Sequence, residues 1–150
     1  MKKILMVCLG NICRSPLAQG ILESKVNSEN VFVDSAGTGA YHVGNLPDKR
    51  SIKVAKNNGI NITNQTARKF EVSDFDAFDC IYAMDESNCQ HILRLARSDE
   101  DKSKVYLILN ELHPNKNQSV PDPYYGGVQG FENVYNMLND ACDVIASKLS

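Results

Sequence analysis

Short apolar runs alternate along the chain with longer segments in which apolar residues recur every three or four positions. The runs 4–7, 31–33, 80–84 and 105–109 have the length and composition of buried strands. The segments between them are amphipathic, and this alternation is typical of a doubly wound α/β fold. We therefore expect a four-stranded parallel sheet with helices on both faces.

The clearest helix is expected near the C-terminal end of the sequence, where one apolar stripe recurs at helical spacing. Its members are Phe131, Val134, Tyr135, Leu138, Ala141, Cys142, Ile145 and Leu149. Earlier in the chain, Asp48 and Asp85 are expected to cap the N-termini of two helices, and Asn58 and Gly59 to end the first of them. Residues 112–130 are expected to form the longest irregular segment.

Length and composition are those of one globular domain spanning residues 1–150, with 43% apolar residues. The 16 basic and 18 acidic residues nearly cancel, so no broad basic field favours nucleic acid or an anionic membrane. No apolar segment approaches the roughly 20 residues that cross a bilayer. We expect no nucleic-acid partner and no membrane insertion, and we favour a monomer.

The cysteines and histidines indicate which cellular compartment to expect and whether to expect a bound metal. The odd set of cysteines, which has no framework spacing, is Cys8, Cys13, Cys80, Cys89 and Cys142. The apolar run before Cys8 has about four residues, short of the roughly 7–15 of an export signal, so we expect a reduced, cytoplasmic protein. The scattered histidines are His42, His91 and His113. No cluster has metal-ligand spacing, and we expect neither a metal nor a cofactor.

The chemistry of the chain is concentrated in residues 7–16 (VCLGNICRSP), between the first expected strand and a helix start. Five residues separate Cys8 from Arg14, and Ser15 before Pro16 is expected to be the N-cap of the helix. Backbone N–H groups of the loop can converge on one point, where the helix dipole adds positive potential. We predict a phosphate-binding loop between strand 1 and helix 1.

Cys8 is the expected nucleophile of this loop. A lone cysteine at a strand end is usually a small buried hydrophobe, but the spacing, the glycine-containing turn and the helix start agree with a reactive thiol. The positive field favours the thiolate form of Cys8. Arg14 offers a planar fork for two phosphoryl oxygens, and Ser15 can donate its hydroxyl to the departing sulfur.

This segment resembles the hallmark loop of the low-molecular-weight protein tyrosine phosphatase family. Residues 33–38 (VDSAGT), 84–88 (MDESN) and 120–125 (VPDPYY) are also similar to family segments, in the family's order. The resemblance covers essentially the full length. It implies a metal-independent hydrolase whose partner is a phosphotyrosine-containing protein.

The resemblance implies that Asp122 is the general acid. By itself an aspartate between two prolines is typical of a turn, although such a rigid loop would also hold a carboxyl over a pocket. In the implied mechanism Cys8 attacks phosphorus, Arg14 and the loop amides stabilise the phosphoryl oxygens, and Asp122 protonates the tyrosyl oxygen. Water then hydrolyses the cysteinyl-phosphate with Asp122 as base.

Further roles follow from the same resemblance. The phosphate-binding residues would be Leu9, Gly10, Asn11, Ile12, Cys13, Arg14 and Ser15. Asn11, Ser15 and Ser35 would support the loop through hydrogen bonds. Alternatively, Asn11 and Ser35 are polar residues of the kind that is common in turns. The family often has a histidine where this chain has Gln65, which can hydrogen-bond but carries no charge. That departure leaves the rigidity of the support and the pH profile open.

The expected substrate walls are Tyr41, Tyr124 and Tyr125, which could stack a phenyl ring, although Tyr124 and Tyr125 could instead be solvent-exposed loop aromatics. Related arginine phosphatases typically carry threonine at the position of Ile12 and phenylalanine after the Asp-Pro pair. The residues Ile12 and Tyr124 therefore favour phosphotyrosine over phosphoarginine.

Other functions of this architecture stay as alternatives. A thioredoxin-coupled arsenate reductase would relay a disulfide through two further cysteines; Cys89 is near one relay position, but Ala83 occupies the other. A phosphocysteine carrier would dispense with Asp122. The resemblance also implies that Cys13 captures oxidised Cys8 in a reversible disulfide, and the alternative is a small residue that packs beneath the loop.

Overall fold

A computed structural model describes residues 1–125 and 127–149, and of Tyr125 it describes the backbone only. Its four parallel strands lie in the order β2-β1-β3-β4. They are β1 (Lys2–Cys8), β2 (Val31–Gly37), β3 (Cys80–Ala83) and β4 (Val105–Leu107). The chain leaves β1 toward β2 and continues on the other side of β1 with β3. In such sheets the ligand site forms at the carboxyl ends of the strands where the order reverses, here between β1 and β3.

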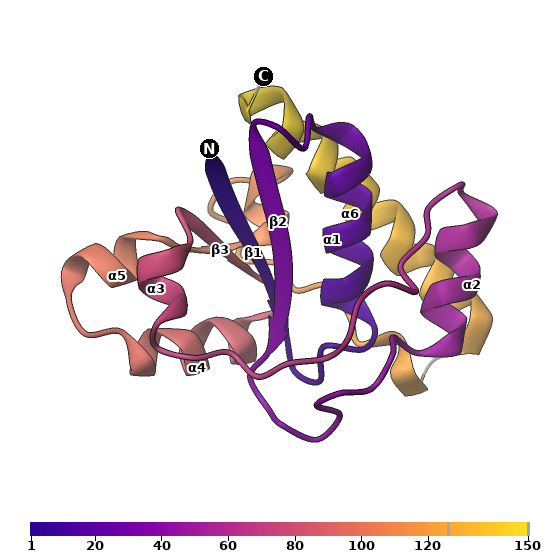
Figure 1. The fold of residues 1–150 in the computed structure, drawn as a ribbon, viewed down its shortest axis with the longest axis horizontal. Helices are drawn as coiled ribbons and strands as arrows, with labels where there is room; N and C mark the ends of the chain where they lie inside the picture. Colours follow the sequence, from indigo (N-terminus) through magenta and orange to yellow (C-terminus); the bar gives the residue numbers. More distant parts are fainter. Residues whose placement is uncertain (126, 150) are drawn as a thin grey trace.

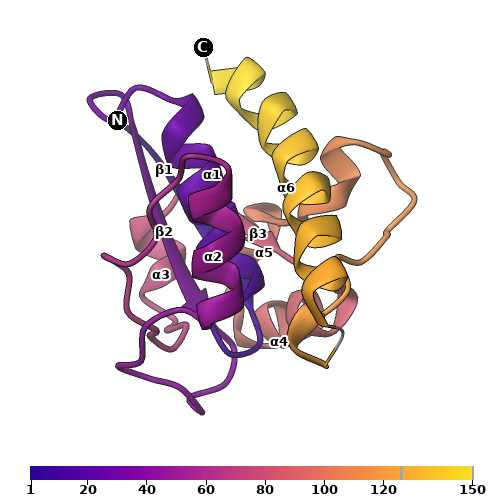
Figure 2. The ribbon, with the colours of Figure 1, turned by 90° about the vertical axis from the view of Figure 1, so that its right-hand side faces the viewer.

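Helices cover both faces of the sheet, which confirms the expected doubly wound α/β fold (Figure 1). One face carries α1 (Arg14–Lys25), α2 (Lys49–Asn57) and α6 (Gly127–Leu149), and the other carries α3 (Asp74–Ala77), α4 (Glu86–Leu95) and α5 (Asp99–Ser103). Figure 2 shows α1, α2 and α6 side by side on their face. Among the described helices, none combines the length and apolarity that a membrane crossing requires.

Strand β1 is buried on both faces, as its uninterrupted apolar run predicts for a central parallel strand. Successive side chains of a strand point to opposite faces. Ile4 and Met6 therefore pack into the cluster that contains the α1 and α6 residues, whereas Leu5 and Val7 pack against α3 and α4. Because both faces hold β1, the loop that follows Cys8 starts from a fixed point.

Two helix starts are confirmed by their caps. Asp48 accepts a hydrogen bond from the Arg50 N–H at 2.8 Å and caps α2, and Asp85 accepts one from the Asn88 N–H at 2.7 Å and caps α4. Helix α2 ends at its predicted C-cap, Asn58. These boundaries follow from local hydrogen bonds that a side chain makes within a few residues of itself.

Three predicted boundaries are wrong. Helix α1 begins at Arg14 with Cys13 in the N-cap position, not Ser15, because the Ser15 hydroxyl lies 3.0 Å from Cys8 Sγ instead of capping. Helix α6 begins at Gly127, so the irregular segment ends before Gly130; the first turn of α6 is mostly exposed and lacks an apolar stripe. The run 105–109 is a strand only to Leu107, and a 3-10 helix, η1 (Ile108–Glu111), follows.

Truncation of Leu138 tests whether α6 is held by the core on its face of the sheet. Leu138 is fully buried in α6, so we expect Leu138→Ala to lower the free energy of unfolding by about 2–5 kcal/mol. Urea denaturation measures this change. The control is Asp140→Ala on the exposed side of the same helix, where we expect a change within about 0.5 kcal/mol. Equal losses in the two variants would contradict the assigned packing.

Candidate active site

A pocket of about 370 Å³ opens where β1 ends. Its lining consists of Cys8, Leu9, Gly10, Ile12, Cys13, Arg14, Tyr41, His42, Asp122 and Tyr124. The thiol, the arginine and the aspartate predicted from the sequence thus come together from two distant parts of the chain. Two other predicted loop residues, Asn11 and Ser15, do not line the pocket but contact the sulfur of Cys8.

The loop between β1 and α1 turns its carbonyl groups toward neighbouring segments. Three carbonyl oxygens accept backbone hydrogen bonds: Cys8 from Thr38 at 2.9 Å, Leu9 from Gly39 at 2.9 Å and Ile12 from Asp48 at 2.8 Å. Because these carbonyl oxygens bond to segments outside the loop, N–H groups of the loop are left to point into the pocket. This polarity, with the N-terminus of α1 beside it, suits an anion such as phosphate.

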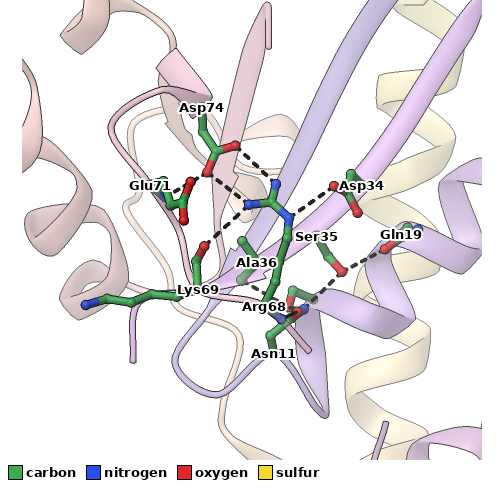
Figure 3. A network of polar contacts seen from close by, with 10 residues as sticks. Asn11, Gln19, Asp34, Ser35, Ala36, Arg68, Lys69, Glu71 and Asp74 are labelled. Atoms are coloured by element: carbon green, nitrogen blue, oxygen red, sulfur yellow. Dashed lines mark hydrogen bonds and ion pairs between the residues drawn. The ribbon is translucent and has the colours of Figure 1, made fainter. Parts of the chain in front are cut away.

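Asn11 is the buried centre of the loop's support. Its φ of 57° lies in the left-handed region, which asparagine tolerates better than most residues. Its Oδ1 accepts the Arg68 N–H at 3.0 Å, and its Nδ2 donates to Ser15 Oγ at 2.8 Å and Ser35 Oγ at 2.9 Å. The Ser35 hydroxyl in turn donates to Gln19 Oε1 at 2.7 Å (Figure 3). Every polar atom of the Asn11 side chain therefore has a partner.

Two donors reach the sulfur of Cys8. The Asn11 N–H lies 3.3 Å from Sγ, and Ser15 Oγ lies 3.0 Å from it. Ser15 Oγ already accepts a hydrogen bond from Asn11, so its own proton is available to the sulfur or to the Ala36 carbonyl at 3.5 Å, and the sulfur is the nearer of the two. Both contacts are of the kind that stabilises negative charge on sulfur.

Arg14 connects the loop with the segment that carries Asp122. Its side chain is 3% exposed, and Nη1 donates to Asp85 Oδ2 at 2.7 Å and to the Val120 carbonyl at 2.9 Å. Nη2 lies 3.8 Å from Asp122 Oδ2. Asp85 also caps α4, so one carboxylate anchors both the helix and the guanidinium. The role of Asp85 as partner of Arg14 could not be read from its capping pattern.

Asp122 stands at the rim of the pocket. Its side chain is 38% exposed, and its Oδ1 accepts the N–H of Tyr124 at 3.0 Å, a bond typical of an Asx turn. The carboxyl group therefore faces both Arg14 and the open part of the pocket. A group in this position can exchange a proton with a molecule bound above Cys8.

Tyr124 forms a wall of the pocket that is held by Arg50. The Arg50 guanidinium lies 5.3 Å from the ring centroid of Tyr124 and 4.6 Å from that of Phe131, within cation–π range. Asp48 binds the same guanidinium through two contacts of 3.0 Å. These hydrogen bonds lower the pKa of Asp48 and raise the pKa of Arg50. The wall is thus connected to the carboxylate that caps α2.

The two other residues expected to form pocket walls, Tyr41 and Tyr125, are not placed as Tyr124 is. Tyr41 lines the pocket with a side chain that is 77% exposed, whereas the side chain of Tyr125 lies outside the part of the chain that the structure describes. His42 also lines the pocket, although no motif marks it in the sequence. It reaches the site because the loop after β2 folds over Gly10, an arrangement that no local pattern encodes.

The remaining cysteines are not equivalent to Cys8. Burial raises the pKa of the Cys13 thiol to about 12, and the charges of Asp48, Cys8 and Asp122 act in the same direction. Burial also raises the pKa of Cys80 and of Cys89. Cys80 packs against the cluster around α1 and α6, Cys89 packs against the cluster on the opposite face, and neither lines the pocket.

Gln65 does not join the support of the loop. Its Nε2 donates to the Pro16 carbonyl at 3.1 Å, and its buried Oε1 has no hydrogen-bond partner among the described residues. The terminal acceptor of the Asn11 and Ser35 hydrogen bonds is Gln19, which the sequence does not distinguish from the other polar positions of α1.

Comparison with known proteins agrees with this geometry. The family model described as low molecular weight phosphotyrosine protein phosphatase matches residues 3–150. A low molecular weight phosphotyrosine protein phosphatase of Schizosaccharomyces pombe is 45% identical over 143 residues, which cover 92% of this chain and 90% of the relative.

Solved structures are similar over nearly the whole chain. A protein tyrosine phosphatase from Entamoeba histolytica has a TM-score of 0.93 and 39% identity, and the match covers 99% of this chain and 97% of that one. A Drosophila arginine phosphatase has a TM-score of 0.88 and 32% identity, with coverages of 99% and 97%.

Substitution of Gly37 tests whether the loop needs its close approach to β2. A Cβ at Gly37 would lie 2.7 Å from the Leu9 carbonyl oxygen and 3.2 Å from Asn11 Cβ, so the loop must shift. We expect Gly37→Ala to weaken binding of inorganic phosphate by about tenfold or more, measured by isothermal titration calorimetry.

The control is Gly130→Ala in α6, where the added Cβ meets Pro123 Cβ at an ordinary 3.8 Å. We expect it to bind phosphate as the unchanged protein does. Unchanged phosphate affinity in Gly37→Ala would show that the loop does not depend on this contact.

Proposed function

Because the chain belongs to the low molecular weight phosphotyrosine protein phosphatase family, and is thus a protein-tyrosine phosphatase, we propose that it works through a cysteinyl-phosphate intermediate. Cys8 is the nucleophile, Arg14 binds the phosphoryl group, and Asp122 is the general acid and base. The observation that carries the proposal is that these three side chains line one pocket.

In the first step, Cys8 Sγ attacks phosphorus in line with the tyrosyl oxygen. The P–S bond forms while the P–O bond breaks, and Asp122 gives its proton to the leaving phenolate. The Arg14 guanidinium and the inward N–H groups of the loop stabilise the charge on the three equatorial oxygens. The contacts of Arg14 with Asp85 and Val120 support this role, because they hold the guanidinium before substrate binds.

In the second step, water attacks the phosphorus of the cysteinyl-phosphate. Asp122, now a carboxylate, takes a proton from that water, and the P–S bond breaks to release inorganic phosphate. The thiolate that leaves is stabilised by the Ser15 hydroxyl and the Asn11 N–H, both already within hydrogen-bond distance of Sγ. The cycle returns every proton and needs no metal.

The pocket walls support phosphotyrosine as the substrate. Ile12 and Tyr124 line the pocket, where the Tyr124 ring can stack on a phenyl group and the apolar Ile12 offers no polar partner for a guanidinium. Phosphoarginine is the second candidate, because a Drosophila arginine phosphatase shares the fold. The positions of Cys80 and Cys89 on opposite faces of the sheet argue against a disulfide relay.

We further propose that residues 1–150 form one domain. The family model spans residues 3–150, and both apolar clusters are built on the same four-stranded sheet. In this arrangement the two loops of the site depend on one core.

Phosphate release from matched peptides tests the substrate. We expect release from phosphotyrosine peptides to exceed release from phosphoserine and phosphoarginine peptides of the same sequence. Phosphoserine holds its phosphate close to the peptide backbone, and the phenyl ring of phosphotyrosine can stack on Tyr124 and lie against Ile12. Cys8→Ser is the control and should release no phosphate from any of them. Equal or greater release from phosphoarginine would refute the assignment.

Removal of the acid tests the role of Asp122. We expect Asp122→Ala to lower kcat for phenyl phosphate by about 10²–10⁴, because general acid–base catalysis is lost. The loss should be smaller for 4-nitrophenyl phosphate, whose leaving group needs no proton. Asp140→Ala, which removes an exposed carboxylate of α6, should leave both rates unchanged. A phosphocysteine carrier would accept the phosphoryl group of phenyl phosphate as fast in Asp122→Ala as in the unchanged protein.

A further inference from the structure

We propose that Arg68 is a positioning residue of the phosphate loop: held between Asp34 and Asp74, it sets from outside the pocket the direction of the hydrogen bonds that end on Cys8. The inference rests on the proposed function for its effect on turnover. Its effect on the sulfur depends on the structure alone.

The Arg68 side chain is fixed by carboxylates from two elements. Its Nε donates to Asp34 Oδ2 of β2 at 3.2 Å, and Nη1 and Nη2 each donate to one oxygen of Asp74 in α3 at 3.1 Å. Figure 3 shows the guanidinium between the two carboxylates. Burial would lower the pKa of Arg68, but the hydrogen bonds and charges of Asp74 and Asp34 raise it. The pairs therefore hold a fully charged guanidinium in a half-buried position.

The Arg68 backbone is held as tightly as its side chain. Its carbonyl accepts the Gly37 N–H at 2.8 Å, and Phe70 N–H donates to the Gly37 carbonyl at 2.7 Å, so the segment runs beside the end of β2. Asp74 also accepts the N–H of Glu71 at 2.8 Å. This leaves the Arg68 N–H pointing at Asn11 Oδ1, 3.0 Å away.

A backbone N–H can only donate, and this determines the orientation of the Asn11 amide. With Oδ1 turned to Arg68, Nδ2 must face Ser15 and Ser35, whose hydroxyl oxygens then accept. The Ser35 proton is then directed to Gln19 Oε1 at 2.7 Å. The Ser15 proton is directed to Cys8 Sγ at 3.0 Å, which is nearer than the other acceptor within reach, the Ala36 carbonyl at 3.5 Å. The donors thus run in one direction, from the Arg68 N–H through Asn11 and Ser15 to the sulfur.

Loss of this orientation would change the chemistry of the sulfur. If the Asn11 amide turned over, its carbonyl oxygen would face Ser15 and compete with Cys8 Sγ for the hydroxyl proton. The Cys8 sulfur would lose a donor in the free enzyme, and the thiolate that leaves in the second step would lose it too. Arg68 touches neither the pocket nor the substrate position, so its influence passes through Asn11.

Arg97 provides a matched control, because it forms the same kind of contacts without reaching the loop. Its Nη2 donates to Asp76 Oδ1 at 2.7 Å, and its Nε to Asp101 Oδ2 at 2.9 Å. Asp76 belongs to α3, as Asp74 does. Arg97→Ala therefore removes a comparable arginine–carboxylate network from the same side of the sheet.

The experiment compares Arg68→Ala, Arg68→Lys and Arg97→Ala. Three measurements are made on each variant: its stability in urea, its kcat and KM for an aryl phosphate, and the rate at which iodoacetate alkylates Cys8. The alkylation rate is followed from about pH 4 to about pH 9, a range that covers the pKa values of reactive and free thiols. We expect Arg68→Ala to move the alkylation profile to higher pH and to lower kcat about tenfold or more, a loss of transition-state stabilisation of about 1.4 kcal/mol. Arg68→Lys should have an alkylation profile and a kcat between those of Arg68→Ala and the unchanged protein. Arg97→Ala should change stability alone.

Several outcomes decide the inference. An unchanged alkylation profile and kcat in Arg68→Ala, at a stability like that of Arg97→Ala, would overturn it and leave a structural ion pair. If Arg68→Ala does not fold, Asp34→Asn weakens only the Nε contact, and an upward shift of the profile in that variant supports the inference while no shift overturns it. If the unchanged protein releases no phosphate, the proposed function is overturned. A shift of the alkylation profile between that protein and Arg68→Ala would still support the positioning role of Arg68.

Discussion

The side-chain amide of Asn11 joins segments that are far apart in the sequence. It bonds Ser15 at the start of α1, Ser35 in β2 and the backbone of Arg68, and its own N–H faces the sulfur of Cys8. A loop that turns its N–H groups inward has few internal hydrogen bonds, so it must be held from outside. The left-handed conformation of Asn11 brings the amide within reach of all three partners. Displacement of this one side chain would free the loop on which the rest of the site is built.

A second connection joins the buried floor of the pocket to its exposed rim. Arg14 is almost fully buried and contacts Asp85, the Val120 carbonyl and Asp122, so it bridges the loop and the segment before α6. A buried guanidinium is stabilising only when its donors are satisfied, and removal of one carboxylate would leave an unpaired charge. Arg50 repeats the principle at the rim, where it stacks on an aromatic wall. Both halves of the site are thus held by arginines that contact side chains of other elements, Asp85 for Arg14 and Tyr124 and Phe131 for Arg50.

The fold followed from the sequence more readily than the site's support. The four strands and the caps Asp48 and Asp85 are predicted from local signals, and the structure confirms their presence, although the last strand is shorter than its apolar run. The prediction of Ser15 as an N-cap is wrong because its hydroxyl contacts Cys8, a residue seven positions away, instead of the helix backbone. Gln19 and Arg68 act through partners that are 16 and 57 residues away, respectively, so no spacing along the chain marks them. What sequence could not supply is therefore the set of contacts between elements, which exist only once the sheet has formed.

The floor of the pocket around Cys8 and the rim with Tyr41 and Tyr124 differ in burial, so substitutions at the two places have different effects. Cys8 is 3% exposed, and the donors to its sulfur are buried and fully paired, so a substitution there disturbs several hydrogen bonds at once. Tyr41 and Tyr124 are 77% and 39% exposed and can change without breaking that network. In the proposed mechanism the floor performs the phosphoryl transfer, and the rim meets the rest of the substrate. Substrate preference can then shift through the rim while the chemistry of the floor stays the same.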